Sequence, residues 1–145
     1  MELALWFQCE DISQQQREEI DSITNSAPTA AEKAVDMHLD LRFNVVVTND
    51  SLISDLNRDF RHKDSLTDVL SFPLGKKDEI NGEIYICWSR VLSQAEDYGH
   101  TWQREYAYLL VHGILHLLGY EHGSEPCPEM RKMEEKTLGL MEMGR

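Results

Sequence analysis

Residues 106–118 read YAYLLVHGILHLL, a run that is apolar apart from two histidine rings and two tyrosine hydroxyls. A helix that is apolar on every side is buried at the centre of a domain, so this stretch predicts a central core helix. Its two imidazoles, His112 and His116, need partners, because an unpaired polar group in a core costs about 1–3 kcal/mol. The pair therefore requires a chemical explanation.

The two histidines stand four positions apart, so their rings project from one face of the helix, about 6 Å apart along its axis. This is the spacing of two ligands on one metal ion. A third histidine, His122, would point to the opposite side if the helix continued, but Gly119 can end the helix and let the chain turn back. We therefore expect His112, His116 and His122 to bind one metal. Counted along the sequence from His112, the positions of His116, Gly119 and His122 match the ligand spacing of metzincin zinc sites.

Three imidazoles leave one coordination position open, which is typical of a catalytic rather than a structural zinc site. Such an ion lowers the pKa of a bound water toward about 7 and polarises the group under attack. A fourth ligand from Glu121 or Cys127 would close the site, and this alternative stays open. One zinc ion per chain is expected, although imidazoles also suit nickel and other transition metals.

The composition indicates one acidic domain. The chain has 145 residues, of which 41% are hydrophobic, enough for a single core. Its 26 acidic and 14 basic residues give a net charge of −12, which repels nucleic acid at long range. The three cysteines, at positions 9, 87 and 127, are far apart, as in proteins of a reducing compartment.

The sequence predicts neither a signal peptide nor a membrane span. Its N-terminus, MELALWFQCE, lacks the basic start and long apolar stretch of a signal peptide. No segment approaches the ~20 apolar residues that a membrane span needs. A cytoplasmic protein without a membrane partner is the expectation.

Strand-like and helix-like segments alternate, which predicts one α+β domain over residues 1–145. Strands are expected at 3–9, 41–49, 69–72 and 83–88, with Pro73 ending the third and a charged loop at 75–82. Helices are expected at 14–24, about 51–60, 89–98, 101–118 and 125–141. Ser13 and Thr101 are expected to cap helices, and Gly99 is expected to end one. The stretch 26–38 is unclear: Pro28 interrupts it, and residues 30–37 could be helical. Met130, Met133, Leu138 and Met141 are the buried positions expected in the last helix. The prediction is a four-stranded mixed sheet with about five helices, one of them central and buried beside a metzincin-like metal site.

Basic residues gather in one place despite the acidic balance. Arg58, Arg61 and Lys63 lie close together, and Lys76 and Lys77 follow. A guanidinium group matches phosphate in bidentate geometry, so these residues are candidates for RNA contacts. The alternative is an ordinary solvated helix end, where basic residues suit the helix dipole.

The residue after the first histidine argues against a protease. Metzincins carry a glutamate there as general base, whereas this chain has Gly113. The spacing thus favours a metal site, and the missing carboxylate disfavours peptide hydrolysis by the usual route.

The stretch HGILHLLGYEH (112–122) resembles the HGxLHLxGYDH motif of the YbeY family of metal-dependent endoribonucleases, the rRNA maturation factors. Three upstream segments are similar to family segments in the same order: LNRDFRHKDSLTDVLSFP (56–73), GEIYIC (82–87) and QAEDYGHTWQRE (94–105). Leu66 replaces the family's proline, Glu121 its aspartate and Phe60 its tyrosine. None of these departures removes a metal ligand.

The resemblance implies an α+β fold with a four-stranded sheet and a central helix, and a zinc-type ion on His112, His116 and His122. It implies single-strand-specific cleavage of RNA in 3′-end maturation of small-subunit ribosomal RNA and in ribosome quality control. Ribosomal RNA, the ribosome and small-subunit proteins are the implied partners. The family's functional arginine aligns with Arg61, so Arg61 and His112 are the expected catalytic residues. Arg58, Arg61 and Lys63 are the expected RNA contacts.

The mechanism expected from these residues places the phosphodiester between the strand ending in Phe72 and the histidine helix. The metal and Arg61 would stabilise charge on the phosphate oxygens. The attacking group, water or the ribose 2′-hydroxyl, is left open. Two rival functions remain: a metalloprotease-like hydrolase, and a non-catalytic ribosome-associated factor whose metal is structural.

Overall fold

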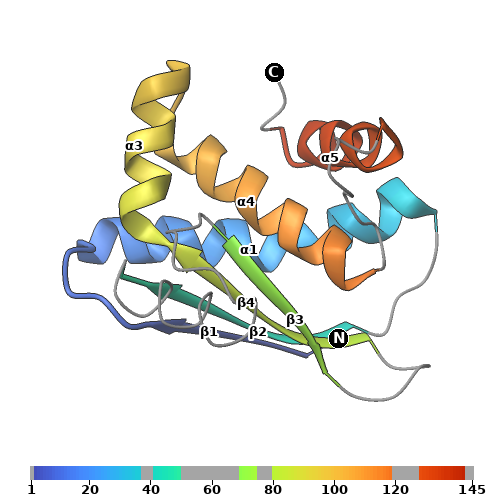
Figure 1. Ribbon diagram of the computed structural model, residues 1–145, viewed down its shortest axis with the longest axis horizontal. Helices are drawn as coiled ribbons and strands as arrows, with labels where there is room; N and C mark the ends of the chain where they lie inside the picture. Colours follow the sequence, from blue (N-terminus) through green and yellow to red (C-terminus); the bar gives the residue numbers. More distant parts are fainter. Residues whose placement is uncertain (1, 37–40, 50–68, 75–79, 119–127, 143–145) are drawn as a thin grey trace, which may run out of the picture.

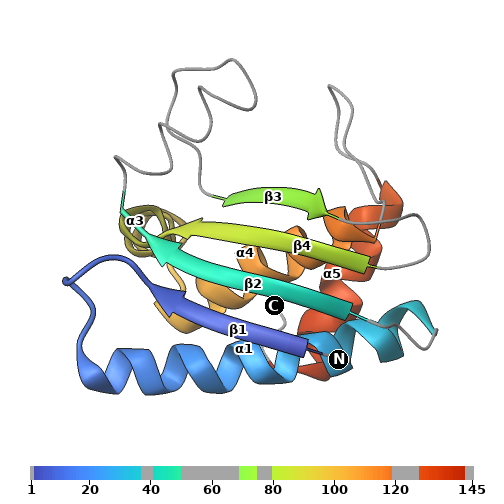
Figure 2. The ribbon, with the colours of Figure 1, turned by 90° about the horizontal axis from the view of Figure 1, so that it is seen from below.

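The computed structural model describes residues 2–36, 41–49, 69–74, 80–118 and 128–142. Within these ranges one sheet has the strand order β1 (Glu2–Phe7), β2 (Leu41–Thr48), β4 (Ile80–Cys87) and β3 (Val69–Leu74). Strands β1, β2 and β4 run parallel, and β3 pairs antiparallel with β4. The described helices are α1 (Gln14–Val35), α3 (Trp88–Tyr98), α4 (Trp102–Leu117) and α5 (Pro128–Leu140), and they gather on one face of the sheet (Figures 1 and 2). The expected α+β class is confirmed.

Helix α4 lies at the centre of the helical layer. It packs against β3 and β4 and also contacts α1, α3 and α5. Its Leu110 and Ile114 are fully buried in one core cluster with Val45 of β2 and Ile84 of β4, which are register partners on the same sheet face. The prediction of a central core helix is confirmed.

Helix α1 begins where the sequence predicts and ends much later. The Ser13 hydroxyl accepts the Gln16 N–H at 3.1 Å, and the Gln16 side chain accepts the Ser13 N–H at 2.9 Å, which completes a capping box. The helix then continues through Pro28 to Val35. The expected interruption between residue 24 and Pro28 was wrong, whereas the helix that was left open from residue 30 onward is present as part of α1. A proline inside a helix costs about 3 kcal/mol, but Pro28 and the alanines around it are buried, and α1 packs against both α4 and α5.

Strand β3 includes Pro73, which was expected to end it. Pro73 pairs with Gly82 in the antiparallel register. Among the described strands, β3 stands at the edge of the sheet and pairs with β4 alone, so the missing N–H of a proline is tolerated there. Strand β4 begins at Ile80 rather than 83, so the end of the expected charged loop 75–82 belongs to the sheet.

The remaining boundaries differ by a few residues. Helix α3 starts at Trp88, one residue before the expected Ser89, and ends at Gly99 in the left-handed conformation (φ 68°), as predicted. In α5, Leu138 is buried and Met133 and Met141 are partly buried against the core, in line with the sequence. The side chain of Met130, the helix expected at about 51–60 and the third cysteine lie outside the described part of the chain.

In the described ranges, every helix is too short or too polar to cross a membrane.

Candidate metal centre

Helix α4 carries His112 and His116 on one face. It starts after Thr101, whose hydroxyl accepts the Arg104 N–H at 3.3 Å, as the sequence predicts. It then runs without a break to Leu117, so the two histidines keep the spacing of one helical turn. Their rings meet edge to face, with centroids 4.6 Å apart and planes at 80°.

The two Nε2 atoms of this pair point at each other across 3.0 Å. Two nitrogen ligands on a tetrahedral zinc ion, each about 2.0–2.1 Å from the metal, lie about 3.3 Å apart. The separation in the structure is therefore close to the one that two imidazoles need to share an ion. Both histidines are half-buried at the C-terminal end of α4.

The other nitrogen of His112 is held by α5. Its Nδ1 lies 2.8 Å from Oε1 of Glu134, whose side chain is only 6% exposed. Tyr108, one turn earlier on α4, flanks the same ring with its centroid at 6.0 Å. A histidine that ligates a metal through one nitrogen usually gives its other N–H to a carboxylate or carbonyl. The pair therefore has the chemistry of a metal site.

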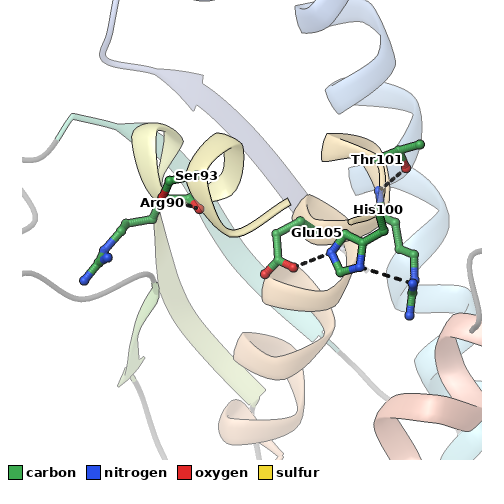
Figure 3. Close-up of polar contacts among 6 residues, drawn as sticks. Arg90, Ser93, His100, Thr101 and Glu105 are labelled. Atoms are coloured by element: carbon green, nitrogen blue, oxygen red, sulfur yellow. Dashed lines mark hydrogen bonds and ion pairs between the residues drawn. The ribbon is translucent and has the colours of Figure 1, made fainter. Parts of the chain in front are cut away.

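A second histidine–glutamate pair lies at the other end of α4 (Figure 3). Nε2 of His100 lies 2.7 Å from Oε1 of Glu105, and a guanidinium nitrogen of Arg104 lies 3.2 Å from the His100 Nδ1. Arginine only donates, so Nδ1 accepts and Nε2–H donates to Glu105. Both ring nitrogens of His100 are thus occupied by protein. Glu105 is 2% exposed, and its Oε2 has no hydrogen-bond partner among the residues that the structure describes.

Tyr106 lies between the two pairs and fastens α4 to α1. The Thr24 hydroxyl donates to the Ile20 carbonyl at 2.6 Å, so its oxygen accepts from the Tyr106 hydroxyl, 2.7 Å away. Complete burial raises the pKa of Tyr106 well above its ordinary value of 10.0, because the phenolate would lose its hydration. The phenol is a neutral structural anchor.

The other residues predicted for the site lie outside the described part of the chain. They are the third histidine His122, the hinge Gly119, the alternative ligands Glu121 and Cys127, and the basic residues Arg58, Arg61 and Lys63. Their roles, and the likeness to a metzincin site, remain predictions.

Sequence reasoning missed Glu134. A signal for it exists in α5: Glu134 directly follows Met133 and stands four positions before Leu138, on the stripe expected to be buried. A carboxylate on the apolar stripe of an amphipathic helix needs a buried partner. The sequence gives no means of choosing His112 as that partner, 22 positions away.

Comparison with known families gives a match over nearly the whole chain. The sequence model of the family described as Endoribonuclease YbeY matches residues 7–143. An Endoribonuclease YbeY from Carboxydothermus hydrogenoformans is 44% identical over 104 residues, which cover 70% of this chain and 73% of the relative. Another from Roseiflexus castenholzii is 40% identical over 118 residues, or 72% of this chain and 73% of the relative.

A solved structure agrees with the fold. The solution structure of TM1509 from Thermotoga maritima superposes with a TM-score of 0.63 at 29% identity, over 97% of this chain and 91% of that one. The resemblance that the motifs of residues 56–122 carry is thus confirmed, and the chain belongs to the YbeY endoribonuclease family.

Proposed function

We propose that this chain is a metal-dependent endoribonuclease that cleaves single-stranded RNA in 3′-end maturation of small-subunit ribosomal RNA and in ribosome quality control. Its relatives carry the name endoribonuclease, which makes the chain an RNA-cleaving hydrolase. The metal, the single-strand preference and the ribosomal role extend that family activity. The observation that best supports the metal is the convergence of two imidazole Nε2 atoms at 3.0 Å; the single-strand preference and the ribosomal role follow from the family resemblance.

His112 and His116 would hold the ion from α4, with His122 as the third ligand. When bound, such an ion supplies Lewis acidity, which lowers the pKa of water toward about 7 and stabilises charge on phosphate oxygens. Zinc is the proposed ion because imidazole nitrogen is among its usual ligands, and nickel is the main alternative.

The basic residues would bind the phosphate groups of the RNA. Arg61 would bind the scissile phosphate in bidentate geometry and stabilise the charge that develops on it. Arg58 and Lys63 would attract the RNA backbone, since the chain as a whole carries a charge of −12. Binding is therefore expected to be strongly dependent on salt.

The proposal extends to location and partners. A cytoplasmic enzyme with an acidic surface, such as QQQREEIDS (14–22), is suited to meet basic small-subunit proteins on the ribosome. Gly113 is buried inside α4 and offers no carboxylate, so the chain lacks at that position the general base that metzincin proteases carry.

The test begins with elemental analysis of the purified protein, followed by cleavage assays on a single-stranded RNA, a matched duplex and casein. We expect one zinc-type ion per chain and cleavage of the single strand alone. Chelation should stop cleavage, and the returned ion should restore it. Cleavage that persists after the metal is gone would refute metal dependence, and casein hydrolysis would favour the protease.

The variant Arg61→Ala separates phosphate binding from metal binding. It should lower cleavage while leaving the metal content unchanged. Loss of metal in this variant would mean that Arg61 supports the metal centre instead. A protein that chelation merely unfolds, with no turnover before or after, would be the non-catalytic ribosomal factor.

A further inference from the structure

Glu134 is the buried charge of α5. It is 5% exposed, whereas its neighbours Glu135 and Lys136 are exposed. Burying a carboxylate is costly unless it is paired and hydrogen-bonded. The hydrogen bond that compensates Glu134 is the one at 2.8 Å to Nδ1 of His112, on a different helix. The position of this carboxylate is therefore tied to a single ring on α4.

This contact fixes which nitrogen of His112 carries the proton. A carboxylate only accepts hydrogen bonds, so His112 donates from Nδ1. In the neutral ring Nε2 then presents a lone pair, the form that a metal ion requires. This lone pair accepts the Nε2–H of His116, 3.0 Å away. A metal ion shared by the two rings would take the place of that proton.

The carboxylate itself is held in place by the packing of α5. Leu138, one turn after Glu134, is buried in the core, and the Thr137 hydroxyl donates to the Met133 carbonyl at 2.7 Å. Helix α5 contacts both α1 and α4. Glu134 thus approaches His112 from a rigid element and not from a loop.

We propose that Glu134 is the positioning residue of the metal centre. It holds His112 in the Nδ1–H tautomer and aims Nε2 at the ion that His112 shares with His116. This inference rests on the proposed metal-dependent function and adds to it a residue of α5 that the motifs of residues 56–122 do not contain. Removal of a carboxylate that supports a ligating histidine typically costs roughly 10–100-fold in metal affinity.

The experiment compares Glu134→Ala and Glu134→Gln with a matched control, Glu135→Gln, which changes the adjacent exposed carboxylate of the same helix. Zinc affinity is measured by competition with a chelator on the full-length chain. The His112 tautomer is read from imidazole ¹⁵N shifts in the metal-free protein, assigned with His112→Ala. Urea unfolding checks that each variant is folded.

We expect roughly 10–100-fold weaker zinc binding in Glu134→Ala, with His112 shifting toward the Nε2–H tautomer. Glu134→Gln keeps an oxygen that can accept the Nδ1–H, so it should retain the tautomer and lose less affinity. Glu135→Gln should match the wild type. A structural role alone would lower the stability of Glu134→Ala and leave the tautomer of its folded fraction unchanged.

Besides an unchanged tautomer, two zinc-binding results would overturn the proposal, and they differ from each other. If Glu134→Ala binds zinc as tightly as the wild type while His112→Ala does not, Glu134 has no positioning role and the metal centre stands. If His112→Ala binds zinc as tightly as the wild type, the metal centre itself is wrong, and the role of Glu134 falls with it.

Discussion

Each end of α4 has a histidine paired with a buried glutamate, and the two pairs differ in one respect. At the first end His100 gives Nε2–H to Glu105 and accepts Arg104 at Nδ1, so both nitrogens are used by neighbouring protein groups. At the second end His112 uses Nδ1 for Glu134, and its Nε2 faces another imidazole nitrogen. The same two residue types form a closed structural link in one place and a potential ligand pair in the other.

The difference teaches that a histidine's role follows from its second nitrogen. A carboxylate on one nitrogen is common to both pairs, so by itself it does not distinguish a packed core histidine from a metal ligand. Arginine beside His100 supplies a donor and would repel a cation, whereas His116 beside His112 supplies a second soft nitrogen. Substituting each histidine in turn tests whether the two pairs have different roles.

Removing the ring of His112 should have the largest effect. His112→Ala deletes one of the expected ligands, so metal content should fall to background and RNA cleavage should drop roughly a thousandfold or more. Elemental analysis and an RNA cleavage assay measure both. An active His112→Ala enzyme with a full complement of metal would show that the second end of α4 is as structural as the first.

Removing the ring of His100 should leave the metal alone and weaken the fold. His100→Ala leaves the buried Glu105 carboxylate without its donor, which should lower the free energy of unfolding by about 3 kcal/mol. Urea unfolding gives this value, and zinc competition gives the affinity. If zinc affinity falls while the free energy of unfolding is unchanged, His100 and Glu105 belong to the metal site, and the two pairs do not differ in role.

Tyr106 offers the smallest and most selective change, since it stands between the two pairs and belongs to neither. Tyr106→Phe removes one buried hydrogen bond, to Thr24, and should cost about 1 kcal/mol at pH 8 without changing metal affinity. The pKa of Tyr106 is higher in the folded protein than in the unfolded chain, so its contribution is present below the ordinary value of 10.0 and is lost as pH rises above it.

The gap in stability between the wild type and Tyr106→Phe should therefore shrink between pH 8 and pH 11, as urea unfolding at both values will measure. Other groups titrate over this range, but they are common to both proteins and cancel in the difference. A gap that stays constant would mean that the phenol ionises as readily in the fold as in the unfolded chain.

Local signals in the sequence were enough for the elements that depend on neighbouring residues. Ser13 and Thr101 cap helices and Gly99 ends one because each acts on backbone groups within a few positions. The spacing of His112 and His116 likewise predicted that they share one face of a helix, because it depends only on residues four positions apart.

The errors arose where distant parts of the chain decide the outcome. Pro28 stays inside α1 because of what α1 packs against, and Pro73 stays inside β3 because β3 is an edge strand. The residues next to each proline in the sequence reveal neither the packing of α1 nor the edge position of β3. Glu134 was missed on the same grounds, since its partner becomes visible only when α5 docks on α4.

The docking of α5 also sets an order of events during translation. Synthesis proceeds from α4 to α5, so both imidazoles are made before the carboxylate that hydrogen-bonds one of them. The pair is complete only after α5 has emerged and folded back onto α4. If the two imidazoles bind a cation as proposed, the site would therefore reach its full affinity only after α5 has left the exit tunnel.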